Sequence, residues 1–386
     1  MKKLTRRNFM KGAGALTLGA AISPLAPRMA WSSTPTIKMA YILSDHHAPL
    51  MLAASNGEMF EEKYKTWLKP LNPAKLYELY DNGSPIARVQ LIPTKKGPDV
   101  EKLVAQGSVD IAISGTQAIL MSVDKGVDTK IISPLQTAGN VFVLNKDVPA
   151  QDWKAFVSHV KGQGKQFKIG MPGPHTVAAI IFRSALEYEG VSYTEDSTNR
   201  KADVLFINMK GHGNLVAALN NKISEGIIGA QPFPSVTIDQ GVGRLILNLQ
   251  DVPPAQRWAG HACCSLEATS KFLTQDPALA AKALSLMALG VDLANTRKDL
   301  TAKTCSAWLG VSESVETVAM QSMTYTTTAT PRWVSSVDEY AKTMDGMGMF
   351  TGKLQGAQGE ALASAAFDFS MMNGVTEQLK AKGLIA

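Results

Sequence analysis

LVAQGSVDIAISGTQA, residues 103–118, contains in order the end of a helix-like segment, a turn, a short apolar segment and a small polar step. The apolar VDIAIS is typical of a buried strand, and the apolar side chains that follow Gln117 have helical spacing. Strand, short polar turn and helix in succession indicate an α/β protein with a largely parallel sheet.

A second stretch repeats this pattern. AALNNKISEGIIGAQP, residues 217–232, aligns with residues 103–118 without a gap, so that Gly229-Ala230-Gln231 matches Gly115-Thr116-Gln117. Two equivalent halves would place these two steps facing each other. The alternative is that any two strand–helix units look alike over such a short length. From residue 276 onward the chain is mostly helical in pattern.

The first 30 residues have the features of an export signal. MKKLTRRNFMKG contains Arg6 and Arg7 within the pattern Thr-Arg-Arg-x-Phe-x-Lys, and a moderately apolar stretch follows, so residues 1–30 resemble a twin-arginine signal peptide. The alternatives are a chance Arg pair on an ordinary signal and a membrane anchor, but the apolar stretch is shorter than the about 20 residues of a spanning helix. We therefore expect the twin-arginine translocase as a partner and the periplasm as the location.

Removal of this segment changes the charge balance. Residues 1–30 contain six basic and no acidic residues, so the formal charge falls from +6 to zero. A neutral surface gives no reason to expect nucleic acid or an anionic membrane as a partner. A disulfide framework is not expected, because Cys263 and Cys264 are neighbours and Cys305 is far along the sequence.

Several further segments carry a resemblance to a known family. They are HHAPLMLAASNGEMFEEK, LVAQGSVDIAISGTQA, AALNNKISEGIIGAQPF, SKFLTQDPALAAKALSLMALGVDLAN and FDFSMMNGV. In this order and spacing the chain resembles the periplasmic substrate-binding proteins of ABC importers, in the branch that serves nitrate, taurine, aliphatic sulfonates and thiamine-pyrimidine precursors. Two departures put the ligand class in doubt: Gln231 stands where that family commonly has an acidic residue, and Ser224-Glu225 replaces its usual Gly-x-Asp.

The resemblance implies a two-lobed fold of the type II periplasmic-binding-protein class, with mostly parallel sheets and a two-strand hinge. Lobe 1 would comprise residues 31–138 and 258–386, and lobe 2 residues 139–257. The hinge strands would lie near QTAGNVFVLN and RWAGHACCSL. The resemblance also implies a small-molecule ligand, an ABC permease in the inner membrane as partner, no cofactor and no enzymatic activity.

Small polar residues at strand ends and helix starts are the expected ligand-binding residues. In an open α/β sheet, ligands bind beyond the carboxyl ends of strands, where a helix start offers free N–H groups and partial positive charge. This geometry favours an oxyanion such as a sulfonate, carboxylate or nitrate. The predicted set is Asp45, His46, His47, Ser114, Gly115, Thr116, Gln117, Pro174, His175, Thr176, His212 and Gln231. At any single junction, a helix cap without a ligand is the alternative.

Other functions remain open at this stage. Histidine and cysteine side chains together can bind a transition metal or a metal chelate, but no tight spacing such as His-x-x-x-His is present. Cys263 and Cys264 are expected to pack as small buried residues of the second hinge strand. Gly-x-Ser-x-Gly, P-loop and dinucleotide-binding motifs are absent from the sequence. A relative of the implied fold makes the thiamine pyrimidine, so an enzyme of that type and a ligand sensor are the remaining alternatives.

Overall fold

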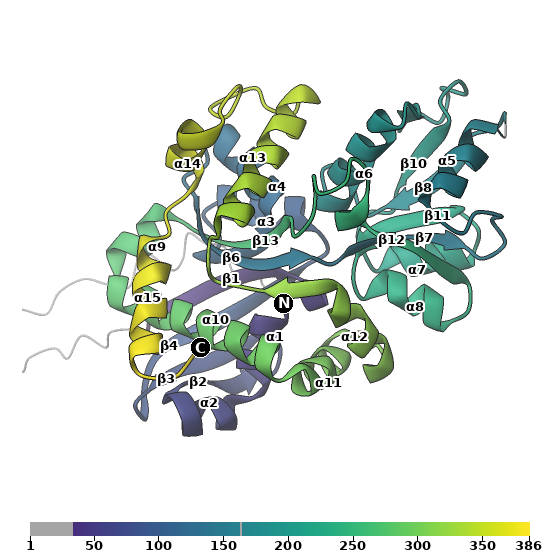
Figure 1. The fold of residues 1–386 in the computed structure, drawn as a ribbon. Helices are drawn as coiled ribbons and strands as arrows, with labels where there is room; N and C mark the ends of the chain where they lie inside the picture. Colours follow the sequence, from purple (N-terminus) through teal and green to yellow (C-terminus); the bar gives the residue numbers. More distant parts are fainter. Residues whose placement is uncertain (1–33, 163) are drawn as a thin grey trace, which may run out of the picture. The chain divides into compact units, whose positions relative to one another are not determined.

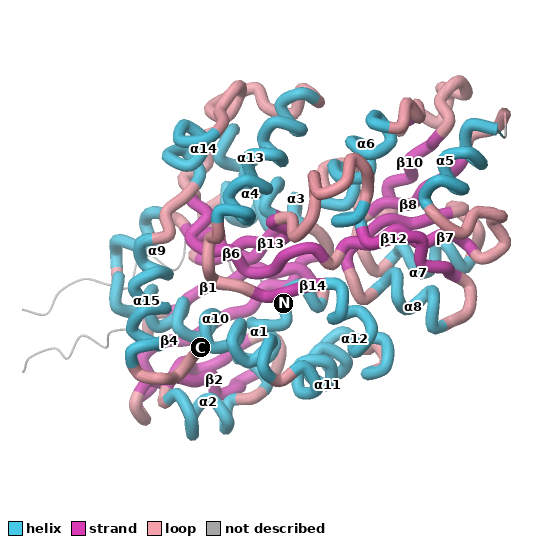
Figure 2. Tube along the Cα trace, viewed as in Figure 1, coloured by secondary structure: helices cyan, strands magenta, loops and turns pink. Residues whose placement is uncertain are grey.

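Two mixed β-sheets with helices packed on them form the described part of the chain, residues 34–162 and 164–386 of this computed structural model (Figures 1 and 2). The α/β class expected from the sequence is confirmed. The predicted signal peptide, with Arg6 and Arg7, lies outside the described residues.

The first sheet has eight strands in the order β14-β6-β13-β5-β1-β4-β3-β2. Only β5, β1 and β4 pair in parallel, whereas the other neighbours are antiparallel. The strands are β1 (Thr36–Ile42), β2 (Thr66–Asn72), β3 (Leu76–Asp81), β4 (Ser84–Thr94), β5 (Ile111–Gly115), β6 (Lys130–Ala138), β13 (Ala262–Ala268) and β14 (Met323–Tyr325).

The second sheet has six strands in the order β12-β7-β11-β8-β10-β9. Here β11, β8, β10 and β9 are parallel, and β7 is antiparallel to both of its neighbours. The strands are β7 (Asn140–Asn145), β8 (Phe167–Met171), β9 (Tyr193–Thr194), β10 (Val204–Asn208), β11 (Gly226–Ala230) and β12 (Gly243–Asn248).

The sheets are therefore mixed rather than mostly parallel, which differs from the expectation. One reason is that short turns join β2, β3 and β4, and two consecutive strands joined by a short turn must run antiparallel. The other is that the strands connecting the two sheets run against the parallel strands beside them.

The chain passes between the sheets twice. Gly139 alone separates β6 of the first sheet from β7 of the second, and the return lies between Asn248 and Ala262. The lobe boundaries predicted from the sequence, 138/139 and 257/258, lie at these crossings. Residues Pro35–Ala386 form one compact unit, so the division into two lobes stays a prediction.

Helices cover both sheets and close the cores. They are α1 (Ala48–Ser55), α2 (Gly57–Tyr64), α3 (Gly97–Ala105), α4 (Thr116–Asp124), α5 (Trp153–Gly162), α6 (Val177–Tyr188), α7 (Asn214–Asn220), α8 (Phe233–Asp239), α9 (Ser270–Gln275), α10 (Pro277–Thr296), α11 (Lys298–Leu309), α12 (Glu313–Ala319), α13 (Pro331–Gly346), α14 (Gly359–Ala366) and α15 (Ser370–Ala381), with short 3-10 turns at Asp45–His47, Leu249–Asp251 and Met320–Ser322.

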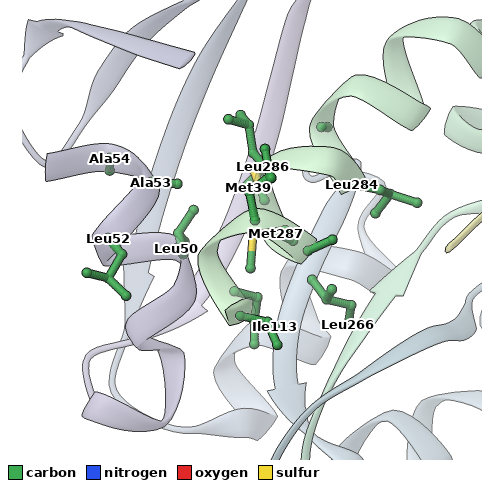
Figure 3. Close-up of a cluster of buried hydrophobic side chains, with 14 of the residues drawn as sticks. Met39, Leu50, Leu52, Ala53, Ala54, Ile113, Leu266, Leu284, Leu286 and Met287 are labelled. Carbon is green, nitrogen blue, oxygen red and sulfur yellow. The ribbon is translucent and has the colours of Figure 1, made fainter. Parts of the chain in front are cut away.

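We call the first sheet with the helices packed on it the first half, and the second sheet with its helices the second half. Helix α10 is the central core element of the first half. It begins at a good cap, since the Asp276 carboxylate accepts a hydrogen bond from the Leu279 amide at 3.0 Å and Pro277 follows. Met287 packs with Met39 of β1 and Leu50 of α1 in one buried cluster (Figure 3). The helix is long and apolar enough to cross a membrane by composition alone, but 67% of that window is buried inside the protein, as in a core helix.

A pair of buried carboxyl groups lies in the same half. Glu101 of α3 accepts a hydrogen bond from Ser122 at 2.6 Å, and Glu267 of β13 accepts one from Thr129 at 2.8 Å. Burial raises the pKa of Glu101. Burial, and then the charge of Glu101, raises the pKa of Glu267 well above its usual range. The pair is therefore most stable when it holds a proton.

We expect Glu267→Gln to improve stability at alkaline pH. A carboxyl group whose pKa is raised on folding contributes its full stabilisation below the unfolded pKa of about 4.3, and this is lost as the pH rises towards the folded pKa. Glutamine donates a hydrogen bond to Glu101 without a proton being taken up. The melting temperature of the wild type should therefore fall more steeply than that of the variant as the pH rises above about 4.3.

Glu62→Gln, the same change on an exposed residue of α2, is the matched control and should leave the slope of the wild type unchanged. If the melting temperatures of the wild type and Glu267→Gln fall equally steeply with pH, Glu101 and Glu267 do not hold a proton between them.

Candidate functional site

A cavity of about 30 Å³ lies between the two sheets. Its walls come from the ends of β1, β5 and β11, from the starts of β7, β13, α3, α4 and α6, and from the turns that hold His46, His47 and His212. The lining residues are Ile42, Ser44, His46, His47, Gly97, Gly115, Gln117, Asn140, Thr176, Val177, His212, Ala230, Cys263 and Cys264. A cavity of this kind needs about 10–15 Å³ to hold one water molecule, so this one has room for about two water molecules or a small polar group.

The turn after β1 places two histidines in the wall. Ser44 caps the 3-10 turn Asp45–His47 and accepts a hydrogen bond from the His46 amide at 3.3 Å. His47 Nδ1 accepts the Ile42 amide at 2.9 Å, which leaves the hydrogen of the neutral ring on Nε2. This buried Nε2 has no partner among the described residues and is a donor in the cavity wall.

His212, from the second half, has the same arrangement. Its Nδ1 accepts the Ala230 amide at 3.3 Å, so its Nε2 also carries the hydrogen. Burial, and then the charge on His46, lowers the pKa of His47 and that of His212 to about 3. Both rings are therefore neutral hydrogen-bond donors at neutral pH.

His46 is oriented in the opposite sense. Its Nε2 lies 3.0 Å from the carbonyl oxygen of Gly139, an acceptor only, so Nε2 carries a hydrogen and Nδ1 faces the two cysteines. The distances from His46 Nδ1 are 3.4 Å to Cys263 Sγ and 3.7 Å to Cys264 Sγ, and the two sulfurs are 3.8 Å apart. We call these three residues the His–Cys–Cys cluster.

Charge within the His–Cys–Cys cluster is paired. Burial alone would lower the pKa of His46, but the Cys263 thiolate and its hydrogen bond raise it to about 9. Burial would raise the pKa of Cys263, but the Cys264 thiol and the charged His46 ring hold it well below its usual range. A hydrogen bond to Cys263 and burial raise the pKa of Cys264 instead. Cys263 is therefore the thiolate and Cys264 the thiol.

Two hydrogen bonds join the halves across the cavity. Ser44 Oγ of the first half donates to the carbonyl oxygen of Gln231 at 2.8 Å, and Gln117 Nε2 donates to the carbonyl oxygen of His175 at 3.0 Å. The structure therefore has a closed arrangement in which polar side chains of one half hold the backbone of the other.

The structure brings half of the predicted site residues to the cavity. These are His46, His47, Gly115, Gln117, Thr176 and His212. The others do not line it: they are Asp45, Ser114, Thr116, Pro174, His175 and Gln231.

Each residue outside the cavity has a local reason. Thr116 is hydrogen-bonded to Ser265 at 2.8 Å inside the first half, with Ser114 buried next to it. Asp45 is buried beside Glu316 rather than facing the cavity, and burial raises its pKa to about 6. His175 is exposed and lines a separate groove with α3 and α4.

The remaining two act through the backbone or as a cap. The Pro174 carbonyl accepts a hydrogen bond from Arg183 at 3.0 Å. The Gln231 side chain accepts the Ser235 amide at 3.3 Å near the start of α8.

Sequence reasoning assigned Cys263 and Cys264 to packing, and the structure places both in the cavity wall. It also missed Ser44 and Asn140. Asn140 Nδ2 donates to Cys263 Sγ at 3.1 Å. The available signal for Cys263, Cys264 and Asn140 was their position in the two segments predicted to cross between the lobes, because such segments border any ligand held between the halves. Ser44 lies outside both segments.

Comparison with known proteins assigns the family. Residues 31–309 match the NMT1-like family model, and the chain belongs to this family. The chain is also 37% identical over 107 residues, 28% of its own length and 74% of the other, to an uncharacterized protein of Methanocaldococcus jannaschii.

Three solved structures with the same fold are those of ligand-binding proteins. The nitrate-binding protein NrtA of Synechocystis PCC 6803 has a TM-score of 0.69 at 16% identity, covering 92% of this chain and 91% of its own. A ligand-binding component of an ABC-type import system from Staphylococcus aureus, with zinc bound, has a TM-score of 0.67 at 16% identity. The match covers 88% of this chain and 99% of that protein. The alkanesulfonate-binding protein SsuA of Xanthomonas axonopodis, bound to MOPS, has a TM-score of 0.63 at 12% identity. The match covers 87% of this chain and 99% of that protein. These matches confirm the periplasmic-binding-protein fold.

We expect Gly139→Ala to disrupt the site. Gly139 has a φ of +75°, and an added Cβ would lie 2.6 Å from His46 Nε2 and 2.7 Å from Gln136 Nε2. The His46 ring would have to move away from the cysteines, with a loss of stability of about 1–3 kcal/mol from the strained backbone and the contact. Thermal or denaturant unfolding measures this loss.

Gly241→Ala is the matched control, since Gly241 has a φ of +67° and nothing within 4 Å of the added Cβ. A loss no greater than that of Gly241→Ala would mean that close packing at the crossing does not constrain His46.

Proposed function

We propose that this chain is the solute-binding component of an ABC importer and that it captures a small solute between its two halves. The observation that carries the proposal is the cavity between the sheets, with walls from both halves and a hydrogen bond across it from Ser44 and from Gln117. Membership of the NMT1-like family and the fold shared with nitrate- and alkanesulfonate-binding proteins support it.

The same proposal includes the location and the partners. The protein would act in the periplasm after export by the twin-arginine translocase, and would deliver its solute to an ABC permease in the inner membrane. The site would bind its solute and release it unchanged.

The chemistry of the cavity limits the solute. Among the described residues that line it, none is Lys or Arg, so a sulfonate, taurine or nitrate would be held by neutral donors such as His47 and His212 Nε2. An anion in a buried site without a paired cation carries a large desolvation cost. A metal ion or small metal complex is the second candidate solute, and the His–Cys–Cys cluster favours it.

Solute binding should stabilise the closed form of the protein. A ligand that binds the closed state better shifts the population towards it, so the true solute should raise the melting temperature and reduce the radius of gyration in solution scattering. Mass spectrometry and elemental analysis of the natively purified protein identify the solute to be used.

Gln117→Ala should weaken this binding. Loss of one neutral hydrogen bond costs about 0.5–1.5 kcal/mol, equivalent to about a 2- to 12-fold loss of affinity by calorimetry. Gln106→Ala, at the exposed end of α3, is the control and should bind as the wild type does. Solute binding without compaction, and with no effect of Gln117→Ala, would refute capture between the halves.

Export is tested separately. Arg6→Lys combined with Arg7→Lys should leave the precursor in the cytoplasm, because the translocase reads the Arg pair. Lys2→Arg with Lys3→Arg keeps the same charge and number of changes and should be exported. Normal processing of the Arg6 and Arg7 double variant, measured by fractionation and immunoblotting, would exclude the twin-arginine route.

A further inference from the structure

We propose that the captured solute is a thiophilic divalent metal ion, with Zn²⁺ the best match, and that His46 Nδ1, Cys263 Sγ and Cys264 Sγ are its ligands. The inference rests on the proposed function and adds the chemistry of the solute. All three ligand atoms lie within 4.8 Å of one another in the wall of the cavity.

The distances within the His–Cys–Cys cluster match those of a metal site. Two sulfurs at about 2.3 Å from a tetrahedral Zn²⁺ are about 3.8 Å apart, and a sulfur and a nitrogen are about 3.5 Å apart. The observed separations are 3.8 Å between the sulfurs and 3.4 and 3.7 Å from His46 Nδ1. A circle through the three atoms has a radius of about 2.1 Å, so an ion at or just outside its plane reaches all three at ordinary bond lengths.

The groups around the cluster orient the ligands. A metal-binding histidine commonly donates its second ring N–H to a carbonyl oxygen, as His46 Nε2 does to Gly139 at 3.0 Å. Asn140 Nδ2 donates to Cys263 Sγ at 3.1 Å, which stabilises a thiolate ligand. Neither contact has to change when an ion binds.

Charge favours a divalent ion over an anion. Two thiolates and a neutral imidazole carry a charge of −2, which a divalent cation neutralises within a buried cavity. Binding of the ion would release the thiol proton of Cys264 and the proton on His46 Nδ1. The metal ion would therefore take the place of two protons in the cluster.

Two further histidines of the cavity wall complete the site. His47 and His212 hold their hydrogens on Nε2 because their Nδ1 atoms accept backbone amides, so these rings are donors and not metal ligands. In this proposal the two rings donate hydrogen bonds to a water molecule or small anion, which is the fourth ligand of the ion. The cavity volume of about 30 Å³ has room for an ion with one such group.

Metal titration of the full-length chain tests the inference. The protein is purified with a thiol reductant, stripped with a chelator and titrated with Zn²⁺ against a chromophoric chelator, with Cu⁺ as a parallel arm. We expect one Zn²⁺ per chain, and X-ray absorption should show sulfur ligands at about 2.3 Å and nitrogen or oxygen ligands at about 2.0 Å.

Matched variants assign the ligands. Cys263→Ser, Cys264→Ser and His46→Gln should each lower Zn²⁺ affinity by at least about 100-fold, and Asn140→Ala, next to the ligands, by about 10- to 100-fold. Cys305→Ala removes the third buried cysteine, which lies against Met51 in the core, and should leave the affinity unchanged. Circular dichroism and melting of each apo variant separate loss of ligands from loss of fold.

The outcomes separate this inference from the proposed function. Absence of Zn²⁺ binding, with compaction by taurine, nitrate or a sulfonate, would overturn the metal and leave solute capture standing. Zn²⁺ bound by these ligands, with no compaction and no change in cellular zinc uptake on deletion, would overturn solute capture. Preference for Cu⁺ over Zn²⁺, or a Cys263–Cys264 disulfide in the exported protein, would overturn the assignment to a divalent ion.

Discussion

The hydrogen bond from His46 Nε2 to the Gly139 carbonyl oxygen is the contact on which the site depends. Gly139 is the single residue between β6 of the first sheet and β7 of the second, and its carbonyl also accepts the Gln231 amide of the second half at 3.1 Å. This one carbonyl group therefore lies at the crossing of the chain, orients the His46 ring and binds the second half through the Gln231 amide. A glycine is required there because any Cβ would meet the ring that the carbonyl orients.

Close packing at the crossing also explains why buried polar groups are tolerated. Cys263 and Cys264 lie on β13 and reach the cavity near the point where the chain first leaves the first sheet. His47 and His212 remain neutral since burial disfavours their charged forms, while His46 and Cys263 hold opposite charges. Buried charge is stable only when it is paired, and here both members of the pair line the cavity. The proposed binding of a solute would therefore depend on some of the same interactions as folding.

Much of the fold could be predicted from local patterns. The stretch 103–118 contains the end of α3, β5 and the start of α4, and the matching stretch 217–232 contains the end of α7 and β11. Short apolar segments followed by small polar residues have few alternatives, so their elements follow from local physics. The antiparallel neighbours of β6, β7 and β13 were not predictable in this way. Strand pairing depends on residues that are distant in the sequence, and β6, β7 and β13 are buried along nearly their whole length, which is the pattern usual for parallel strands.

The sequence by itself determined the element types, the positions of the crossings and the presence of histidines near strand ends. Only the tertiary structure decided which of these side chains meet. His46 and Cys263 are 217 positions apart, and their approach to 3.4 Å follows from the pairing of β13 with β5 and β6. His175 has equally suitable local context but faces outward, because a helix start fixes where the backbone goes and the packing of α6 against its neighbours decides where a side chain points. Chemistry that needs three atoms within a few ångströms is set by long-range packing, which no local pattern encodes.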